Sequence, residues 1–255
     1  MIGVICETTE EIQSLQDDMG DPHIRECAGM TFVTGTVCEK PVTAVCTNSG
    51  KVNNAVCAQI LLGEMGADML IGFGTARGLS EGLTLGDVIL VRKSNYFDVD
   101  ASALGYQPGE VIGLGETEFD ADENLLAAGQ EACRKVLAED AFRVGTAITG
   151  DKIVTESQEQ EQLHILWEAD CADMEGAAIA QVAYLHQKPW LLFRAVSELP
   201  EWVPDESEDA LEVLDSWKNE DELELPDQEE EDFLYFRETT IENFTRILQE
   251  LLKRL

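Results

Sequence analysis

Short apolar runs rich in Val and Ile alternate along the chain with segments of helical periodicity. This alternation predicts an α/β domain with a largely parallel sheet, because the apolar runs suit buried strands and the segments between them suit helices. We expect strands at residues 2–6, 31–37, 42–47, 69–74, 88–91, 141–149 and 190–197. The clearest helices are expected at residues 10–19, 52–65, 123–137, 175–185 and 237–255. In the second of these, Val52, Val56, Ile60 and Met65 follow helical spacing and are predicted to face the sheet.

Two segments interrupt this alternation. Residues 95–114 mix aromatic, Gly and Pro residues after a strand, and long loops of this kind commonly carry functional residues. Residues 199–232 contain sixteen acids and one base, Lys218. Because like charges repel and little apolar surface is available to bury, we expect a solvated, partly disordered acidic insert before the C-terminal helix.

Length and composition fit one domain over residues 1–255, since 44% hydrophobic residues can bury a sizeable core. The formal net charge of −34 argues against nucleic-acid and anionic-membrane partners, because both require a positive surface. Seven cysteines without a C-x-x-C pair or zinc-like spacing predict reduced thiols and no metal site. The sequence has neither a signal-peptide pattern nor an apolar run of about 18 residues, so we expect a cytoplasmic protein.

A glycine-rich turn follows the strand predicted at residues 69–74. In LIGFGTARGL, Gly72, Gly74, Thr75 and Gly78 allow tight turns in which N–H groups and a hydroxyl face a ligand. Ligands of open α/β sheets bind beyond the carboxyl ends of strands, where this turn is expected. Glycine turns also occur for structural reasons alone, so both interpretations stay open for this motif.

Several acids lie near predicted strand ends and helix starts, namely Glu7, Glu10, Glu11, Asp173, Glu175 and Glu198. Helix capping explains acids at helix starts and is sufficient for Asp173. Glu175 precedes the small residues GAAIA, and a carboxylate in so apolar a setting needs partners such as sugar hydroxyls. Glu198 ends an apolar strand, which is compatible with a site residue or with an ordinary loop acid.

Together, these motifs resemble the 5'-methylthioadenosine/S-adenosylhomocysteine nucleosidases of the purine nucleoside phosphorylase superfamily. In family order they are IGVI with Glu10 and Glu11, SGKV at 49–52, GTARGL at 74–79, GDVIL at 86–90, YFDVD at 96–100 with LGY at 104–106, TGD at 149–151, DMEGAAIA at 173–180 and FRAVSE at 193–198. The resemblance implies a single-domain, three-layer phosphorylase/hydrolase-like fold with a central, mostly parallel mixed sheet flanked by helices. It also implies a homodimer without a cofactor, because the segment at residues 96–106 matches a family loop that reaches the neighbouring subunit's site.

The resemblance further implies roles for individual residues. Members of the family hydrolyse the N-glycosidic bond of adenine nucleosides, with a water-activating glutamate at the position of Glu11 and an acid that protonates purine N7 at the position of Glu198. Glu175 matches the glutamate that holds the ribose hydroxyls and favours the cationic sugar. Further substrate contacts are expected from Thr75, Ala76, Arg77, Ile153, Val154, Asp173, Met174 and Ser197, with Asp173 at the rim. An acid at the leaving group and a base on water are what glycoside hydrolysis requires.

Some positions depart from the family pattern. Glu198 replaces an aspartate, Ile153 an aromatic residue that stacks on adenine, and Arg77 a glycine. Glu7 and Thr8 replace a small residue and a methionine. We expect Glu7 and Arg77 to face the 5' side of the pocket and either to form an ion pair or to bind a polar substrate, since two unpaired charges there would be costly.

Two other functions are compatible with the sequence. A phosphorylase of this superfamily carries a G-D-P-x-R loop directly after strand one, whereas the similar Gly20-Asp21-Pro22 with Arg25 follows the first helix and is expected to be a turn. A nucleoside-binding protein would keep the pocket and lose hydrolysis through the changes at positions 77, 153 and 198. The retained Glu11 and Glu175 favour an enzyme.

Overall fold

The computed structural model describes residues 1–202 and 227–255, with side chains placed for residues 1–202 and 234–255. Its strands are β1 (Ile2–Cys6), β2 (Gly20–Cys27), β3 (Met30–Val37), β4 (Lys40–Cys46), β5 (Met69–Gly78), β6 (Val88–Tyr96), β7 (Glu118–Asp120), β8 (Phe142–Thr149), β9 (Cys171–Asp173) and β10 (Trp190–Glu198). The helices are α1 (Thr9–Asp17), α2 (Lys51–Gln59), α3 (Glu123–Val136), α4 (Ser157–Trp167), α5 (Gly176–Leu185) and α7 (Asp227–Leu252). A π-helical turn, η1 (Ile60–Glu64), continues α2, and a 3-10 turn, η2 (Ser102–Leu104), lies in the loop after β6.

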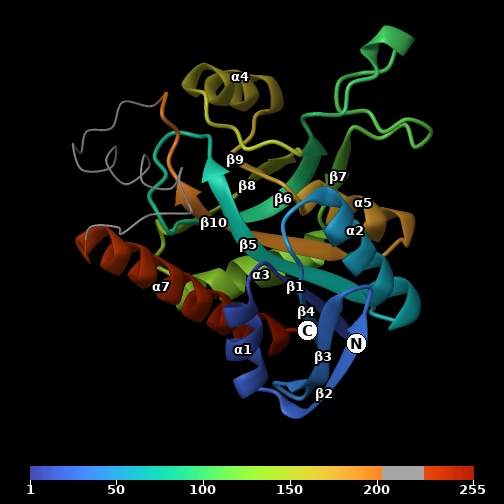
Figure 1. The fold of residues 1–255 in the computed structure, drawn as a ribbon, viewed down its shortest axis with the longest axis vertical. Coiled ribbons are helices and arrows are strands. Elements are labelled where there is room, and N and C mark those ends of the chain that lie inside the picture. The colour runs from blue at the N-terminus through green and yellow to red at the C-terminus, as the bar shows by residue number, and fades with distance from the viewer. Residues whose placement is uncertain (203–226) are drawn as a thin grey trace.

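The strands form one mixed sheet that is parallel at its centre (Figure 1). β1 pairs in parallel with β4 and β5, and β5 pairs in parallel with β10. β6 runs antiparallel to β10 and parallel to β8, and β9 connects β8 to β5. These pairings close a ring of strands, β5-β10-β6-β8-β9, while β1, β4, β3 and β2 extend from β5 as an open sheet. The carboxyl ends of β1, β5 and β10 therefore lie at the same end of the sheet, where the candidate site is found.

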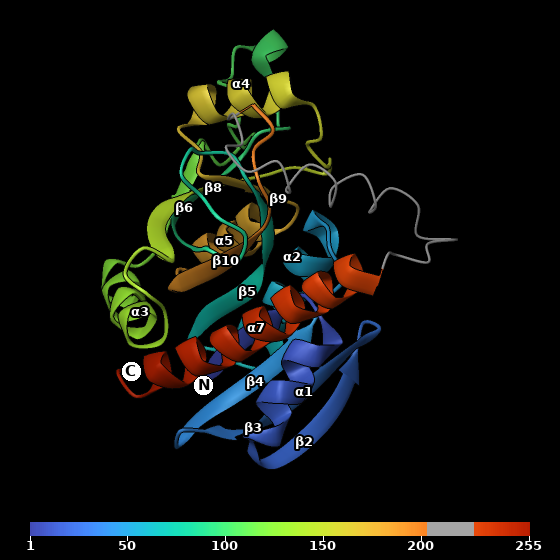
Figure 2. The same ribbon diagram turned by 90° about the vertical axis from the view of Figure 1, so that its left-hand side faces the viewer.

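Helices cover both faces of the sheet, which confirms the predicted three-layer α/β fold. α1 and α3 both contact α7 on one face (Figure 2), and α2 packs against α5 on the other (Figure 1). The core between these layers is apolar and continuous, as in Val4, Leu70, Ile71, Leu192 and Phe193, all of which are fully buried. Among the described residues, no helix is both long enough and apolar enough to span a membrane.

The seven predicted strands are all present, but β2, β7, β9 and α4 were not predicted from the sequence. β2 is an edge strand whose residues are almost all exposed, so it has no apolar alternation, and its first residues are the Gly20-Asp21-Pro22 that we expected to be a turn. β7 and β9 have three residues each and are too short to give a pattern. In α4 the apolar Ile165 and Leu166 are exposed and the polar Gln160 is buried, which removes the helical signal.

The prediction for the buried face of the helix at residues 52–65 is wrong for its two valines only, since Ile60 is 4% exposed and Met65 packs against the core. Val52 and Val56 are 74% and 40% exposed, whereas Asn54 and Cys57 are buried. Asn54 is compatible with the core because its side chain accepts a hydrogen bond from Thr47 Oγ1 and donates to the carbonyls of residues 48 and 50. The inner face of α2 therefore contains the hydrogen-bonded Asn54 instead of the two valines.

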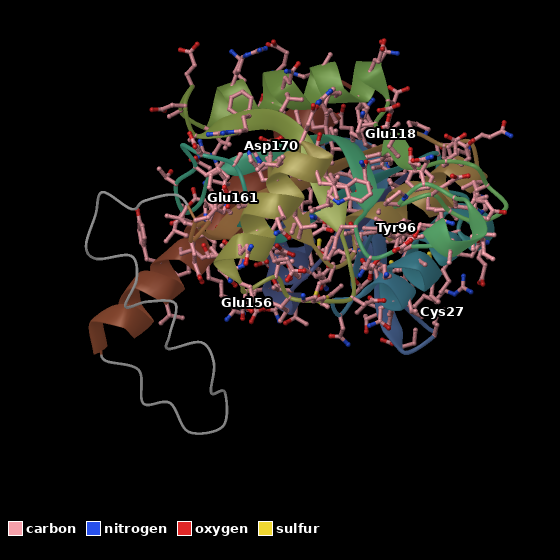
Figure 3. All side chains as sticks on the ribbon, turned by 90° about the horizontal axis from the view of Figure 1, so that it is seen from above. Cys27, Tyr96, Glu118, Glu156, Glu161 and Asp170 are labelled. Atoms are coloured by element: carbon pink, nitrogen blue, oxygen red, sulfur yellow. The ribbon has the colours of Figure 1, made fainter. Side chains whose placement is uncertain are left out.

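The acidic segment expected at residues 199–232 lies largely outside the described residues. α7 begins at Asp227, before the predicted start at residue 237. At the beginning of the segment, Trp202 Nε1 donates to the carbonyl oxygen of Leu79 at 3.2 Å. Many acids elsewhere lie on the surface, as Glu118, Glu156 and Glu161 do in Figure 3.

Candidate active site

A buried arginine near the end of β10 is the centre of the first carboxylate cluster. Arg194 is 1% exposed, its Nε donates to Asp173 Oδ2 at 2.7 Å, and its Nη2 lies 3.6 Å from Glu175 Oε1. Burial lowers the pKa of Arg194, but Asp173 and Glu175 more than offset this effect, so the pKa is raised. The guanidinium is therefore a permanent positive charge. No role was predicted for Arg194 from the sequence, although a charged residue inside the apolar run WLLFRAVS is a signal of a buried site residue.

Asp173 fixes the start of α5 and the position of Arg194. Its carboxylate accepts hydrogen bonds from Thr149 Oγ1 at 2.5 Å and from Gly176 N at 3.1 Å, so the capping predicted for it is confirmed. A Cβ at Gly176 would lie 2.5 Å from Asp173 Oδ2, which explains the glycine. The Asp173 side chain has no exposed surface, so the expectation that it lies at the rim is wrong. Its contacts are those of a positioning residue.

Glu175 lies directly before α5 and faces a small enclosed space. It is 6% exposed, and Ser49 Oγ donates to its Oε2 at 3.4 Å. Burial raises the pKa of Glu175, while the charge of Arg194 acts in the opposite direction. Glu175, Ser49 and Arg194 line a cavity of about 10 Å³, roughly the size of one water molecule.

Glu11 combines a structural role with an unusual protonation equilibrium. Its Oε2 accepts hydrogen bonds from the backbone N–H groups of Glu7 at 2.8 Å and Thr8 at 3.1 Å, while Thr8 Oγ1 accepts one from Glu11 N, which makes a capping box at the start of α1. Burial raises the pKa of Glu11 to about 7, the hydrogen bond from Thr8 N lowers it, and the charge of Glu7 raises it. A carboxylate that titrates near neutrality is suited to accept a proton in catalysis.

Glu7 connects the end of β1 to the glycine-rich turn. Its Oε2 accepts hydrogen bonds from Thr75 N at 2.6 Å and Thr75 Oγ1 at 3.0 Å. The two Thr75 donors that we expected to face a ligand are thus bound to Glu7. A Cβ at Gly74 would lie 3.0 Å from both Glu7 Oε2 and Arg194 Nη1, so glycine at this position lets the two charged groups reach the strand.

Arg77 and Glu198 form a second cluster at the ends of β5 and β10. The two residues are register partners and form an ion pair, and Glu201 Oε1 lies 3.9 Å from Arg77 Nη1. Because Glu7 bonds to Thr75 and Arg77 pairs with Glu198, the expected Glu7–Arg77 ion pair is wrong. The remaining residues predicted on these two strand ends also meet, since Ser197 Oγ donates to the carbonyl oxygen of Ala76 at 3.4 Å.

The other predicted contact residues lie beside these clusters. Met174 is half-buried between Asp173 and Glu175. Val154 is buried in a small apolar cluster with Leu79 and Leu163, while the neighbouring Ile153 is 64% exposed.

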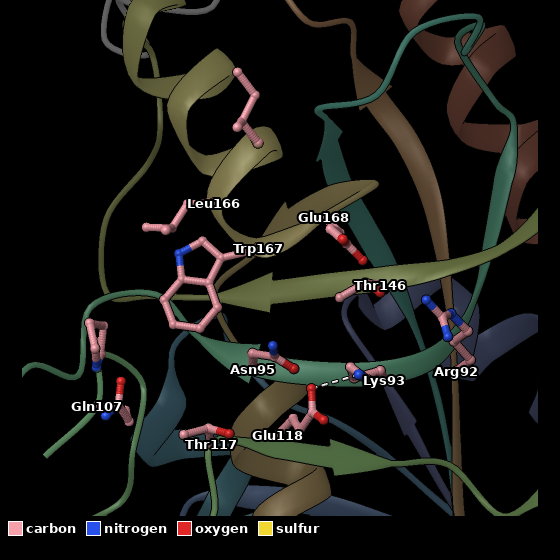
Figure 4. Close-up of a pocket in the computed structure, with 12 residues that line it drawn as sticks. Arg92, Lys93, Asn95, Gln107, Thr117, Glu118, Thr146, Leu166, Trp167 and Glu168 are labelled. Atoms are coloured by element: carbon pink, nitrogen blue, oxygen red, sulfur yellow. Dashed lines mark ion pairs between the residues drawn. The ribbon is translucent and has the colours of Figure 1, made fainter.

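A larger cavity of about 440 Å³ lies between β6, α4 and the loop that follows η2 (Figure 4). Asn95, Gln107 and Trp167 line it, and Lys93 at its edge pairs with Glu118 at 2.6 Å. None of the predicted site residues lines this cavity, so it is separate from the two clusters. Within residues 1–202 and the placed side chains of α7, no group of three His, Cys, Asp or Glu residues is arranged to hold a metal ion.

Comparison with known proteins identifies the family. The model of the phosphorylase superfamily matches residues 1–253. The 5'-methylthioadenosine/S-adenosylhomocysteine nucleosidase of Oceanobacillus iheyensis is 33% identical over 199 residues, which cover 78% of this chain and 86% of that protein. The corresponding crystal structure from Streptococcus pneumoniae, in complex with 8-aminoadenine, has 28% identity and a TM-score of 0.79 and covers 100% of this chain and 99% of its own. The enzyme from Neisseria meningitidis, in complex with methylthio-immucillin-A, has 26% identity and a TM-score of 0.81 with the same coverage. The chain therefore belongs to the 5'-methylthioadenosine/S-adenosylhomocysteine nucleosidase family of the phosphorylase superfamily.

Proposed function

We propose that the protein hydrolyses the N-glycosidic bond of a purine nucleoside and releases the free base. Its relatives are 5'-methylthioadenosine/S-adenosylhomocysteine nucleosidases, so these two adenine nucleosides are the first substrates to test. The observation that carries the proposal is the buried Glu11, whose pKa is raised to about 7 at the edge of a cluster built around Arg194.

Each charged residue has a distinct task in this reaction. Glu11 takes a proton from water while the water oxygen bonds to C1' of the ribose and the electron pair of the C1'–N9 bond passes to the purine. Glu175 holds the ribose hydroxyls, and in its ionised form its carboxylate, 3.6 Å from Arg194, stabilises the positive charge that develops on the sugar; burial raises its pKa and Arg194 acts in the opposite direction. We assign Arg77 and Glu198 to the side of the leaving base rather than Arg77 to the 5' side, because Arg77 pairs with Glu198, whose position resembles that of the family's purine N7 donor. A general base of this kind contributes about 10²- to 10⁴-fold to the rate.

Water is favoured over phosphate as the nucleophile by the charge of the site. Glu7, Glu11, Asp173 and Glu175 place four carboxyl groups around one guanidinium, whereas a phosphate dianion needs several cationic donors. The sequence most similar to a phosphate loop, Gly20-Asp21-Pro22, lies on the exposed edge strand β2. Phosphate-independent base release is therefore expected.

We also propose that the protein is a homodimer. The loop at residues 96–106 resembles the family segment that reaches the neighbouring subunit's site, and its Leu104 is 74% exposed. Ile112 further along the same loop is 57% exposed, and Val52 of α2 is 74% exposed. Burial of such apolar side chains is a common reason for association. Sedimentation at micromolar concentration tests the dimer, and a monomer would contradict it.

A cytoplasmic location is supported by the state of the cysteines. All seven are free thiols, and Cys6, Cys57, Cys133 and Cys171 are buried. Extracellular proteins of the disulfide-rich type instead join such residues into bonds.

The variant Glu11→Gln tests the proposed reaction, because the amide keeps the shape of the side chain and cannot accept the proton. We expect base release to fall by about 10²-fold or more, while nucleoside affinity changes little. The matched control is Glu10→Gln, one residue earlier in the same helical turn, where Glu10 is half-exposed and pairs with Arg237. Turnover of Glu11→Gln within tenfold of the wild type would refute the assignment of the base.

A further inference from the structure

The second cluster places a cation where the resemblance implies a proton donor. Glu198 matches the family position that protonates purine N7, yet here it forms an ion pair with Arg77. The two side chains are only 20% and 9% exposed. A guanidinium in contact with a carboxylate stabilises its ionised form, and an ionised carboxylate has no proton to donate.

Arg77 also has hydrogen-bond donors that are not paired. Its Nε and Nη1 are buried and have no hydrogen-bond partner among the residues with placed side chains, and Glu198 Oε2, which contacts Arg77 Nη2, makes no hydrogen bond there either. Glu201, the other nearby acid, is 3.9 Å from Nη1, which is too far for a hydrogen bond. Buried donors normally have partners, so two such donors on one guanidinium indicate that a ligand supplies the acceptors.

The chemistry of the purine edge then distinguishes the possible bases. A 6-oxopurine such as hypoxanthine or guanine presents two adjacent acceptors, N7 and O6, and arginine binds this pair in a bidentate manner. Adenine presents N7 as an acceptor but a 6-amino group as a donor. Arginine is only a donor, so with adenine one N–H group of Arg77 would face the 6-amino group, which is also a donor.

We infer that Arg77 makes this protein a nucleosidase that prefers 6-oxopurine nucleosides to 6-aminopurine nucleosides, an inference that rests on the proposed function. Arg77 donates to N7 and O6 of the base. When the C1'–N9 bond breaks, its electron pair passes to the purine, which leaves as an anion stabilised by the guanidinium and then takes a proton from solvent. Glu198 orients Arg77 and is not the proton donor.

A pair of substrates that differ only at C6 tests the inference, namely 5'-methylthioinosine and 5'-methylthioadenosine. We expect kcat/KM of the wild type to be about tenfold higher or more for the 6-oxo substrate, in line with the discrimination that a bidentate arginine gives. In Arg77→Gly the ratio of the two kcat/KM values should fall by a similar factor. Arg77→Lys should give an intermediate ratio, because lysine keeps the charge and loses the fork. A wild type that prefers the 6-amino substrate, with a ratio that Arg77→Gly leaves unchanged, would overturn the inference.

Removal of Arg77 leaves Glu198 without its partner, so the double variant Arg77→Gly/Glu198→Gln is measured as well. The double variant should show the same change in the ratio of the two kcat/KM values, with a free energy of unfolding closer to that of the wild type.

Calorimetric binding of hypoxanthine and adenine to the wild type and to Arg77→Gly gives a readout that does not depend on turnover. If no nucleoside releases its base, the proposed function fails, whereas tighter binding of hypoxanthine that disappears in Arg77→Gly still supports the inference, and equal binding of both bases refutes it.

Discussion

The protein has two arginine–carboxylate clusters at the carboxyl ends of its parallel strands, and they differ in burial and in charge balance. In the first, Arg194 is 1% exposed and is surrounded by Glu7, Asp173 and Glu175. In the second, Arg77 faces Glu198 and Glu201, whose side chains are 20% and 35% exposed. The first cluster keeps Glu175, which resembles the family's ribose-binding glutamate, although its Glu7 departs from the family pattern, while both members of the central pair in the second cluster depart from it. We therefore assign the chemistry at the sugar to the first cluster and the selectivity for the base to the second.

The largest expected difference between the clusters is in stability. Arg194→Met should lower the free energy of unfolding by about 3–5 kcal/mol, because it leaves Asp173 and Glu175 buried without their counter-charge. Arg77→Met should cost less, about 1–2 kcal/mol, because the side chains of Glu198 and Glu201 are 20% and 35% exposed and can be partly solvated. Urea denaturation of both variants measures the two values. Equal losses of unfolding free energy in the two variants would contradict the distinction between a fully buried cluster and a partly exposed one.

A second, smaller effect is the dependence of stability on pH. The pKa of Glu11 is about 7 in the folded protein against an ordinary value of 4.5, so the folded state binds this proton more tightly than the unfolded chain does. This contribution to stability is present below about pH 4.5 and is lost as the pH rises through about 7. The free-energy difference between wild type and Glu11→Gln should therefore fall by about 2–3 kcal/mol across this window.

Glu10→Gln is the control for this titration, because burial barely affects Glu10 and a hydrogen bond with Arg237 lowers its pKa. The difference between wild type and Glu10→Gln should stay constant between pH 5 and 8. A constant difference for Glu11→Gln as well would show that Glu11 titrates like an exposed acid.

The smallest effect is expected from Glu7, which lies between Glu11 and the glycine-rich turn. Its charge raises the pKa of Glu11, so Glu7→Gln should lower that pKa and move the acid limb of the kcat/KM profile, near pH 7 in the wild type, to lower pH. Glutamine can still accept the hydrogen bond from Thr75 N, which preserves the turn. The exposed Glu139→Gln is the control and should leave the profile in place. A profile of Glu7→Gln that coincides with the wild type would show that the two carboxylates are not coupled.

Local patterns explain which predictions succeeded. The strands at the centre of the sheet are continuous apolar runs, and Glu11 in the first turn of α1 and Asp173 before α5 accept backbone hydrogen bonds from residues a few positions away. Edge strand β2 and helix α4 gave no such pattern, because their residues face solvent or reverse the usual placement of polar and apolar side chains. On α2 the exposed Val52 and Val56 follow the spacing of a buried helix face, and only the hydrogen bonds of Asn54 explain why this polar residue is buried instead.

The sequence by itself determined the α/β class, the central strands, the family and the presence of Glu11, Glu175 and Glu198 near strand ends, because these follow from periodicity, short-range spacing and ordered motifs. Only the tertiary structure decided how the charges pair. Glu7 is 68 positions from Thr75 and Arg194 is 21 positions from Asp173, and their contacts exist because β1, β9 and β10 all pair with β5 in the sheet. Arg77 was expected beside Glu7, yet the parallel register of β5 and β10 sets it opposite Glu198. Ion pairs between strands depend on register across the sheet, and that register is a property of the folded chain rather than of any local stretch of sequence.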